Sequence, residues 1–253
     1  MNAHRWAARA AAGAATVVLT LTSGVVAQAD DDIDSLPAEE IADRSRDALL
    51  DVDSLHLSAR GSLDGSGPDM SLDLTLDREG NCTGGVDMGE DGSVEIVKLG
   101  DDVWLKPDAA FWNKHVPIGG STFDAILDGR YLKAEADDPR LLSVTTVCDL
   151  DTFRELITDN ADTADRSTLT KGGRTEVNGA PVVPVTRAEG DERLTAYVSA
   201  EGTPYPVRLT VRNADETGTV DFSGFDRPVP TATPPADETV DVTALLGRSI
   251  TPV

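Results

Sequence analysis

The chain has 253 residues, with 45 acidic side chains against 22 basic ones and a formal net charge of −23. Such a charge disfavours partners rich in phosphate, so we expect no binding to nucleic acid and none to anionic membrane surfaces. We interpret the acidity as solubility charge on a protein that works outside the cell.

The first 29 residues show the three parts of a secretory signal peptide. Two arginines precede an apolar run over 10–27, and a small-x-small sequence ends at Ala29. We therefore predict cleavage between Ala29 and Asp30 on the general secretory route. The alternative is an uncleaved membrane anchor, for which the run is only marginally long. Because Asp30 stands where a lipoprotein carries its lipidated cysteine, we expect a released protein with no stable membrane anchor.

An amphipathic helix is predicted over 36–51, because one helical face gathers Ile41, Ser45, Ala48, Leu49 and Val52. From there on, apolar residues alternate with polar ones, which is the pattern of strands with one buried face. The predicted short helices cover 121–127 and 149–157. The predicted strands cover 54–60, 70–77, 82–86, 94–99, 103–106, 130–133, 175–177, 181–187, 193–199, 205–212 and 217–225.

Tight turns join most of these strands, so the predicted sheet is antiparallel. A sheet of about ten or eleven strands curls rather than staying flat. We therefore predict an α+β fold: a large curved half-barrel whose helices cover the apolar concave face. The predicted domains are the signal peptide 1–29, the half-barrel 30–227 and a proline-rich, acidic C-terminal segment 228–253.

Two cysteines, Cys82 and Cys148, follow the signal peptide. An even count in an exported protein predicts a disulfide, with two buried thiols as the alternative. A bridge that closes a loop of about 65 residues contributes about 4 kcal/mol in the chain-entropy model. The C-x-x-C spacing of a redox-active pair is absent from the sequence.

The motifs of common enzymes are missing from the sequence. It has no G-x-S-x-G, H-E-x-x-H, P-loop or G-x-G-x-x-G pattern. The mature chain keeps two histidines: His56 alternates with leucines on the wet face of a strand, and His115 falls in a predicted loop. We predict no catalytic residues, no cofactor and no metal site. A carboxylate-dependent hydrolase stays open as an alternative, since paired acids are abundant.

The scarce aromatic residues gather in the middle of the chain. Trp104, Phe111 and Trp112 lie within nine residues, and Phe153 falls on the apolar face of the helix 149–157. We name these four as candidate ligand-binding residues at the mouth of an apolar cavity. The alternative is that they fill an ordinary core.

Several short motifs in this order resemble the LppX/LprG-type envelope lipoproteins of high-GC Gram-positive bacteria, and more loosely the LolA-like lipoprotein carriers. These motifs are Val103–Pro107 after a Gly-Asp turn, Gly129–Lys133, Cys148–Leu150, Val177–Val182 and Pro204–Leu209. The resemblance implies a half-barrel with helices over a cavity that holds acyl chains, and a non-enzymatic carrier function. The departure is Asp30, where those proteins have their lipobox cysteine.

The sequence thus favours an exported binding or carrier protein for a lipid or another amphipathic ligand. The alternative is a structural or interaction protein of the cell envelope that has no small-molecule ligand. The sequence names no protein partner.

Overall fold

The computed structural model describes residues 32–61, 70–116, 119–138, 146–163, 168–213 and 217–242. From residue 31 onward the chain forms one compact unit. Within the described residues, none of the helices is long and apolar enough to cross a membrane. The predicted signal peptide and its cleavage site between Ala29 and Asp30 lie outside the described residues.

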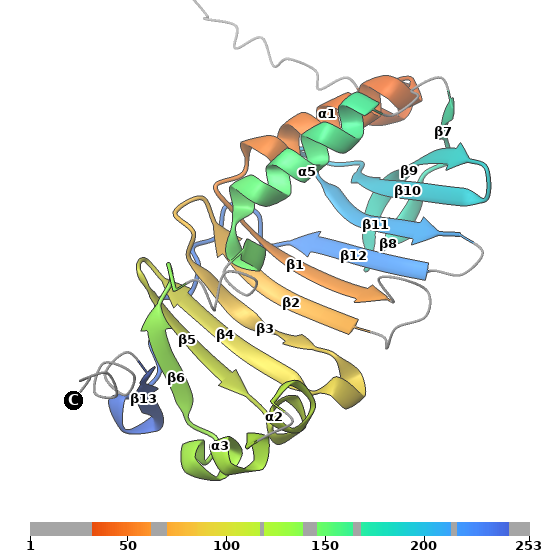
Figure 1. Ribbon diagram of the computed structural model, residues 1–253. Coiled ribbons are helices and arrows are strands. Elements are labelled where there is room, and N and C mark those ends of the chain that lie inside the picture. Colours follow the sequence, from red (N-terminus) through yellow and green to blue (C-terminus); the bar gives the residue numbers. More distant parts are fainter. Residues whose placement is uncertain are drawn as a thin grey trace, which may run out of the picture. The chain divides into compact units, whose positions relative to one another are not determined.

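The three predicted helices, over 36–51, 121–127 and 149–157, are all present. The structure has α1 (Ala38–Asp51), α2 (Ala109–His115), α3 (Gly120–Leu127) and α5 (Leu150–Thr163), with 3-10 turns η1 (Ile33–Ser35), η2 (Gly89–Asp91), η3 (Thr146–Cys148) and η5 (Ala236–Glu238) (Figure 1). The sequence did not predict α2, which has only two turns. The carboxylate of Asp108 caps it by accepting a hydrogen bond from Phe111 N at 2.8 Å. His115 is the last residue of this helix rather than a loop residue.

The described strands form one open sheet of thirteen strands in the order β13-β6-β5-β4-β3-β2-β1-β12-β11-β10-β9-β7, with β8 also paired to β9. Their bounds are β1 Ser54–Gly61, β2 Met70–Asp77, β3 Cys82–Asp87, β4 Ser93–Leu99, β5 Asp102–Pro107, β6 Tyr131–Glu135, β7 Leu169–Lys171, β8 Thr175–Val177, β9 Ala180–Glu189, β10 Glu192–Ser199, β11 Pro206–Arg212, β12 Thr217–Ser223 and β13 Thr239–Asp241.

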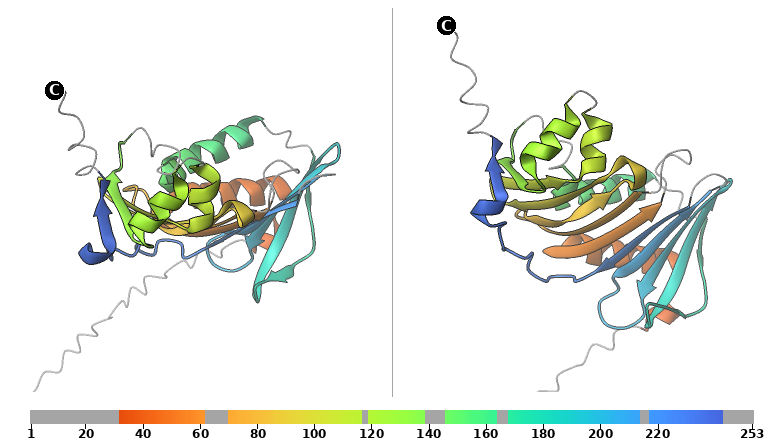
Figure 2. Two further views of the ribbon diagram at one scale, coloured as in Figure 1. Left: turned by 60° about the horizontal axis from the view of Figure 1, so that its bottom comes forward. Right: turned by 90° about the horizontal axis from the view of Figure 1, so that it is seen from below.

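The predicted α+β class and the curved, mainly antiparallel sheet are confirmed (Figures 1 and 2). The strand count differs from the predicted ten or eleven because β7 and β13 were not foreseen. Each has only three residues, which is too short for an alternating pattern to stand out. β13 also pairs with β6 in parallel. Hairpin turns join only antiparallel strands, so no turn in the sequence could predict this pair.

Alternation gives the sheet an apolar face and a polar face. On the apolar face, Leu57 pairs with Phe222 on one side and with Leu74 on the other. The helices α1 and α5 lie over this face (Figure 1). The main core cluster fills the space between them, and its buried members are Leu49, Val52, Leu55, Leu57, Leu74, Leu76, Cys82, Val94, Ile96, Val103, Leu105, Ala134, Cys148, Leu150 and Phe222.

Arg78, just after β2, holds the end of α1 against the sheet. Its Nε donates to Val52 O at 2.8 Å, and its Nη2 donates to Leu50 O at 3.2 Å and to Asp51 O at 2.6 Å. These carbonyls belong to the last turn of the helix, where they lack partners inside it. One guanidinium therefore replaces a helix cap and fixes where α1 ends.

We expect Arg78→Ala to lower the free energy of unfolding by about 1–2 kcal/mol, since charged hydrogen bonds to otherwise unpaired carbonyls are lost. Urea denaturation measures the change. Arg78→Lys is the matched control, because an ammonium keeps the charge but cannot reach all of these carbonyls in a fixed fork. It should recover only part of the loss. Equal midpoints for the alanine variant and the natural protein would contradict the capping role.

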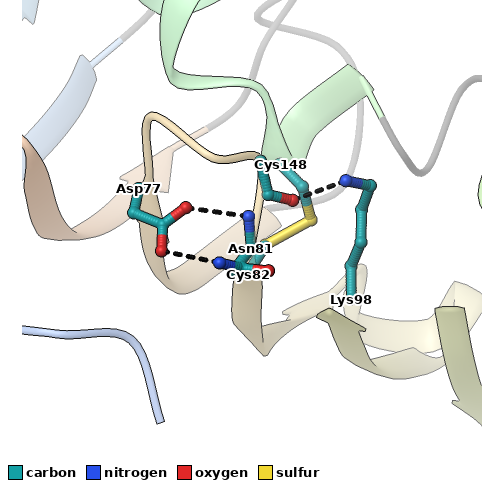
Figure 3. Close-up of a disulfide and its surroundings, with 6 residues drawn as sticks. Asp77, Asn81, Cys82, Lys98 and Cys148 are labelled. Atoms are coloured by element: carbon teal, nitrogen blue, oxygen red, sulfur yellow. Dashed lines mark hydrogen bonds between the residues drawn. A yellow bond between two sulfur atoms is a disulfide. The ribbon is translucent and has the colours of Figure 1, made fainter. Parts of the chain in front are cut away.

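The predicted disulfide is confirmed: Cys82 in β3 bonds to Cys148 in η3, with a Cα–Cα distance of 5.3 Å (Figure 3). A hydrogen-bonded turn precedes it in the chain. Asp77 accepts from the backbone and side-chain nitrogens of Asn81, both at 2.9 Å, and Lys98 donates to a carbonyl of this turn. The bridge therefore attaches the start of α5 to a rigid part of the sheet.

The C-terminal strap, residues 224–238, leads from β12 to β13 across the polar face (Figure 2). At its start, Ser54 Oγ donates to Arg227 O at 2.6 Å, and the carboxylate of Asp226 accepts from Asp53 N at 2.8 Å. The strap thus passes from one half of the sheet to the far edge, which is why β13 can pair with β6 in parallel.

Candidate functional site

Trp104 lies on the polar face of the sheet. In β5 it alternates with Val103 and Leu105, which are buried in the main core cluster on the apolar face. It pairs with Lys133 of β6, whose Nζ is 5.3 Å from the centre of the indole ring. The side chain is only 7% exposed. Trp104 is therefore separated by the sheet from any ligand that binds on the apolar face.

Phe111 and Trp112 lie side by side on α2, with ring centres 5.8 Å apart in an edge-to-face arrangement. Phe111 is half-buried and packs against the main core cluster, so it belongs to the apolar face. The helix start is fixed by Asp108, which also binds Ser93 through the backbone nitrogen at 3.0 Å and the hydroxyl at 2.8 Å. Burial alone would raise the pKa of Asp108, but the hydrogen bonds from Phe111 and Ser93 outweigh it and lower that pKa.

Phe153 of α5 is the fourth predicted residue. It is half-buried, packs against the main core cluster and has its ring centre 5.9 Å from that of Phe222 in β12. The structure therefore places Phe111 and Phe153 on the apolar face, from two different helices, and Trp104 on the opposite face. The ligand-binding role of the four aromatic residues stays a prediction.

The apolar face has a covered half and an open half. Leu57, Leu74 and Phe222 are between 0% and 6% exposed. Two residues further along the same strands, away from the disulfide, the apolar side chains become half-exposed. We call this line the open row, and its members are Ala196, Leu209, Val220, Ala59, Leu72 and Val86.

Strand register makes the open row continuous. Ala196 pairs with Leu209 and Leu209 with Val220. Val220 pairs with Ala59, which pairs with Leu72 of β2. Leu72 in turn pairs with Val86 of β3. Six neighbouring strands at about 4.8 Å spacing give a row about 24 Å long, which is enough to lie along an extended acyl chain.

A positively charged side chain, that of Arg187, lies at the β9 side of this face. Arg187 follows Val183 and Val185 in the alternation of β9 and pairs with Leu194 of β10, one step beyond the open row. Its guanidinium is 3.8 Å from the carboxylate of Glu192, a distance at which the pair is loose. The open row together with Arg187 thus offers an apolar line with a positive group near one end.

No protein-family model matches the sequence, and no curated protein matches it significantly. Among solved structures, LprF from Mycobacterium bovis matches 78% of this chain and 96% of its own, with a TM-score of 0.52 and 15% sequence identity. The chain shares the fold of LprF. The predicted resemblance to LppX/LprG-type proteins is thereby confirmed, at this low identity for the fold alone.

Two further structures are similar with TM-scores too low to carry an argument. The lipoprotein LppX from Mycobacterium tuberculosis covers 77% of this chain and 98% of its own at 15% identity, with a TM-score of 0.49. A putative outer-membrane lipoprotein-sorting protein domain from Vibrio parahaemolyticus covers 76% of this chain and 94% of its own at 11% identity, with a TM-score of 0.24.

The open row is the part of the site that sequence reasoning missed. A search for rare aromatics found Trp104 and Phe111 but ignored small aliphatic residues such as Ala59. The signal was present in part: the hairpin between 54–60 and 70–77 already pairs Ala59 with Leu72. What no local pattern shows is which half of the apolar face the helices leave open.

Proposed function

We propose that the protein is an exported, non-enzymatic binding or carrier protein that holds a lipid or another amphipathic ligand on the open row. The observation that carries this proposal is a continuous line of half-exposed apolar side chains across six paired strands. Each such side chain gains roughly 25 cal/mol for every Å² of apolar surface that a ligand removes from water. The fold shared with LprF and the disulfide, which forms in oxidising compartments, support an envelope or extracellular location.

Arg187 supports an amphipathic rather than a purely apolar ligand. A chain that lies along the row from Val86 towards Ala196 ends near β9, where the guanidinium stands. A phosphate or carboxylate head group there would find a cation whose present partner, Glu192, is 3.8 Å away. Charge-assisted hydrogen bonds of this kind fix orientation as well as affinity.

The alternative of an interaction protein without a small-molecule ligand calls for a large apolar patch outside the apolar face. Among the described residues, the exposed large hydrophobics are Ile126 at 59% and Val147 at 40%. They belong to different elements, α3 and η3, and single exposed apolar residues are ordinary on protein surfaces. The open row therefore favours the binding proposal.

We expect Leu72→Glu to weaken binding of the fluorescent apolar probe 1-N-phenylnaphthylamine about tenfold, because a carboxylate in the middle of the row loses its water when the probe binds. Probe titration of the purified mature protein gives the affinity. Ser71→Glu is the matched control: it adds the same charge at the neighbouring position on the polar face and should change affinity less than about twofold.

Native mass spectrometry of the protein purified from its own host identifies the natural ligand, and we expect a bound lipid. A protein that carries no lipid, and whose probe affinity is the same for Leu72→Glu and Ser71→Glu, would rule out the open row as a binding site.

A further inference from the structure

The open row becomes buried at both of its ends. At the β3 end, Val86 pairs with Val94 of β4, which is only 7% exposed, and Val94 pairs with the buried Pro107 of β5. At the β10 end, Ala196 pairs with Val185 of β9, which is 3% exposed. The line of apolar side chains is therefore exposed from β10 to β3 and covered on either side of that stretch.

The helix α2 covers the β3 end. It packs against β4 and η2, and its start lies over Gly92, just before β4. A Cβ added to Gly92 would clash with Phe111 N and lie 2.6 Å from Phe111 Cα, so a glycine is needed for this close approach. The ring of Phe111 packs against the main core cluster, to which Val94 belongs. Asp108 fixes the helix there, since its carboxylate accepts hydrogen bonds from both Ser93 and Phe111.

The β10 end is covered by η1 and α1. Val185 belongs to a second core cluster together with Ile33 of η1 and Ile41 of α1, and α1 also packs against β9 and β10. Two residues further along β9, Arg187 pairs with Leu194, and its side chain is 20% exposed. A ligand that reaches this end therefore meets apolar cover in front of it and a positive charge at its side.

The open row offers a continuous apolar surface to one acyl chain. Adjacent lines of side chains on one face lie two residues apart, about 7 Å. On the side towards the disulfide, the next line is buried in the main core cluster. On the other side, the next line contains Gly218, which pairs with Gly61, so two neighbouring strands have no side chain there. A second chain beside the first would therefore cross a gap in the apolar surface.

We propose that the open row selects a single-chain amphiphile with an anionic head group, such as a long-chain fatty acid, and that Phe111 limits the length of its chain. This inference rests on the proposed function and names the class of ligand. The carboxylate binds at Arg187, and the methyl end of the chain lies against Phe111 of α2. Between these ends the chain lies along about 24 Å of apolar side chains.

Displacement of 1-N-phenylnaphthylamine by saturated fatty acids from laurate to lignocerate tests the length limit in the full mature chain. Affinity should rise about twofold for each added methylene, because a surface on one side of the chain buries about half of each methylene. The rise should end near stearate, whose extended length is similar to that of the row. Lignocerate should bind more weakly than stearate, since its last methylenes have no place in the row.

Phe111→Ala removes the proposed stop. We expect this variant to bind lignocerate about tenfold more tightly than the natural protein, and laurate, which is too short to reach α2, with unchanged affinity. Trp112→Ala is the matched control, because it removes the neighbouring aromatic ring of the same helix and keeps Phe111. Its preferred chain length should be that of the natural protein.

Two further variants test the two ends separately. Val86→Trp fills the β3 end of the row and should move the optimum to a shorter chain, so it decides the inference even if Phe111→Ala does not fold. Arg187→Gln removes the positive charge and should weaken binding of every fatty acid about tenfold without moving the optimum.

The outcomes separate this inference from the proposed function. The same preferred chain length in the natural protein, Phe111→Ala and Val86→Trp would overturn the inference and leave the function standing. Probe binding that no fatty acid displaces would also overturn it, with the open row left as a site for another amphiphile. Absence of probe binding in the natural protein would refute the function, and the inference with it.

Discussion

Gly84→Ala should cost the protein most of its stability. Gly84 in β3 has φ +147°, and a Cβ added to it would clash with Asp73 O and lie 2.9 Å from Leu74 Cα. Both contacts are backbone atoms of the adjacent strand β2, so no side-chain rotation can relieve them. The strands must separate, and with them the pairing on which Leu74 and Ile96 pack. We expect a loss of about 4 kcal/mol or more, out of a typical total of 5–15 kcal/mol.

The measurement is urea denaturation, or the soluble yield if the variant does not fold. Gly218→Ala is the matched control. Gly218 is also a strand glycine, in β12, but a Cβ added there meets nothing within 4 Å. This change should leave the free energy of unfolding equal or raise it by a few tenths of a kcal/mol, since alanine lowers the conformational entropy of the unfolded chain. If Gly84→Ala costs less than about 1 kcal/mol, β2 and β3 do not approach as closely as the structure has them.

Gly84 also shows how the sheet comes to be curved. Glycine inside a strand marks a sharp bend or a close backbone approach, and β3 has two glycines in succession, Gly84 and Gly85. Gly84 lies on the apolar face between Leu74 and Ile96, and Gly85 lies on the polar face between Asp73 and Glu95.

The strands were the easiest part of the fold to predict. The alternation over 70–77 identifies β2 together with its buried face, and the turn-forming residues on both sides in the sequence predict its partners. α2 escaped prediction because its seven residues are half-exposed or exposed and show no apolar period. In the sequence, Asp108 looks like an ordinary acidic loop residue. Only the hydrogen bond that Phe111 N donates to its carboxylate shows that it caps the start of α2.

The sequence predicted the chemical character of the candidate site but not its location on the sheet. The sequence favoured an apolar surface for an amphipathic ligand, and the aromatics pointed to its location. Yet Trp104 alternates with two buried aliphatic neighbours, which already places it on the opposite face from them. The open row depends on where α1 and α5 come to rest. That position is set by contacts between distant residues, such as Arg78 with Val52 and Cys82 with Cys148, and local patterns do not encode them.

Loss of the disulfide should have the second large effect, on both stability and binding. The bridge closes a loop across a sequence separation of 66 residues, which contributes about 4 kcal/mol in the chain-entropy model. It also pins the start of α5, whose other described apolar contacts with the sheet, through Leu150 and Phe153, cluster within the same first turns. We expect the double variant Cys82→Ala with Cys148→Ala to unfold at a clearly lower urea concentration.

Binding should change as well, because among the described side chains of α5 only Leu150 and Phe153 then hold the helix on the apolar face. We expect the probe 1-N-phenylnaphthylamine to exchange faster, as a loosened helix exposes more of the face beside the open row. Reduction of the natural protein with dithiothreitol should reproduce both effects, and the same reductant should leave the double alanine variant unchanged. If reduction does not change the stability of the natural protein, packing alone holds α5 on the sheet. The covered and open halves of the apolar face would then be set by Leu150 and Phe153 rather than by the bridge.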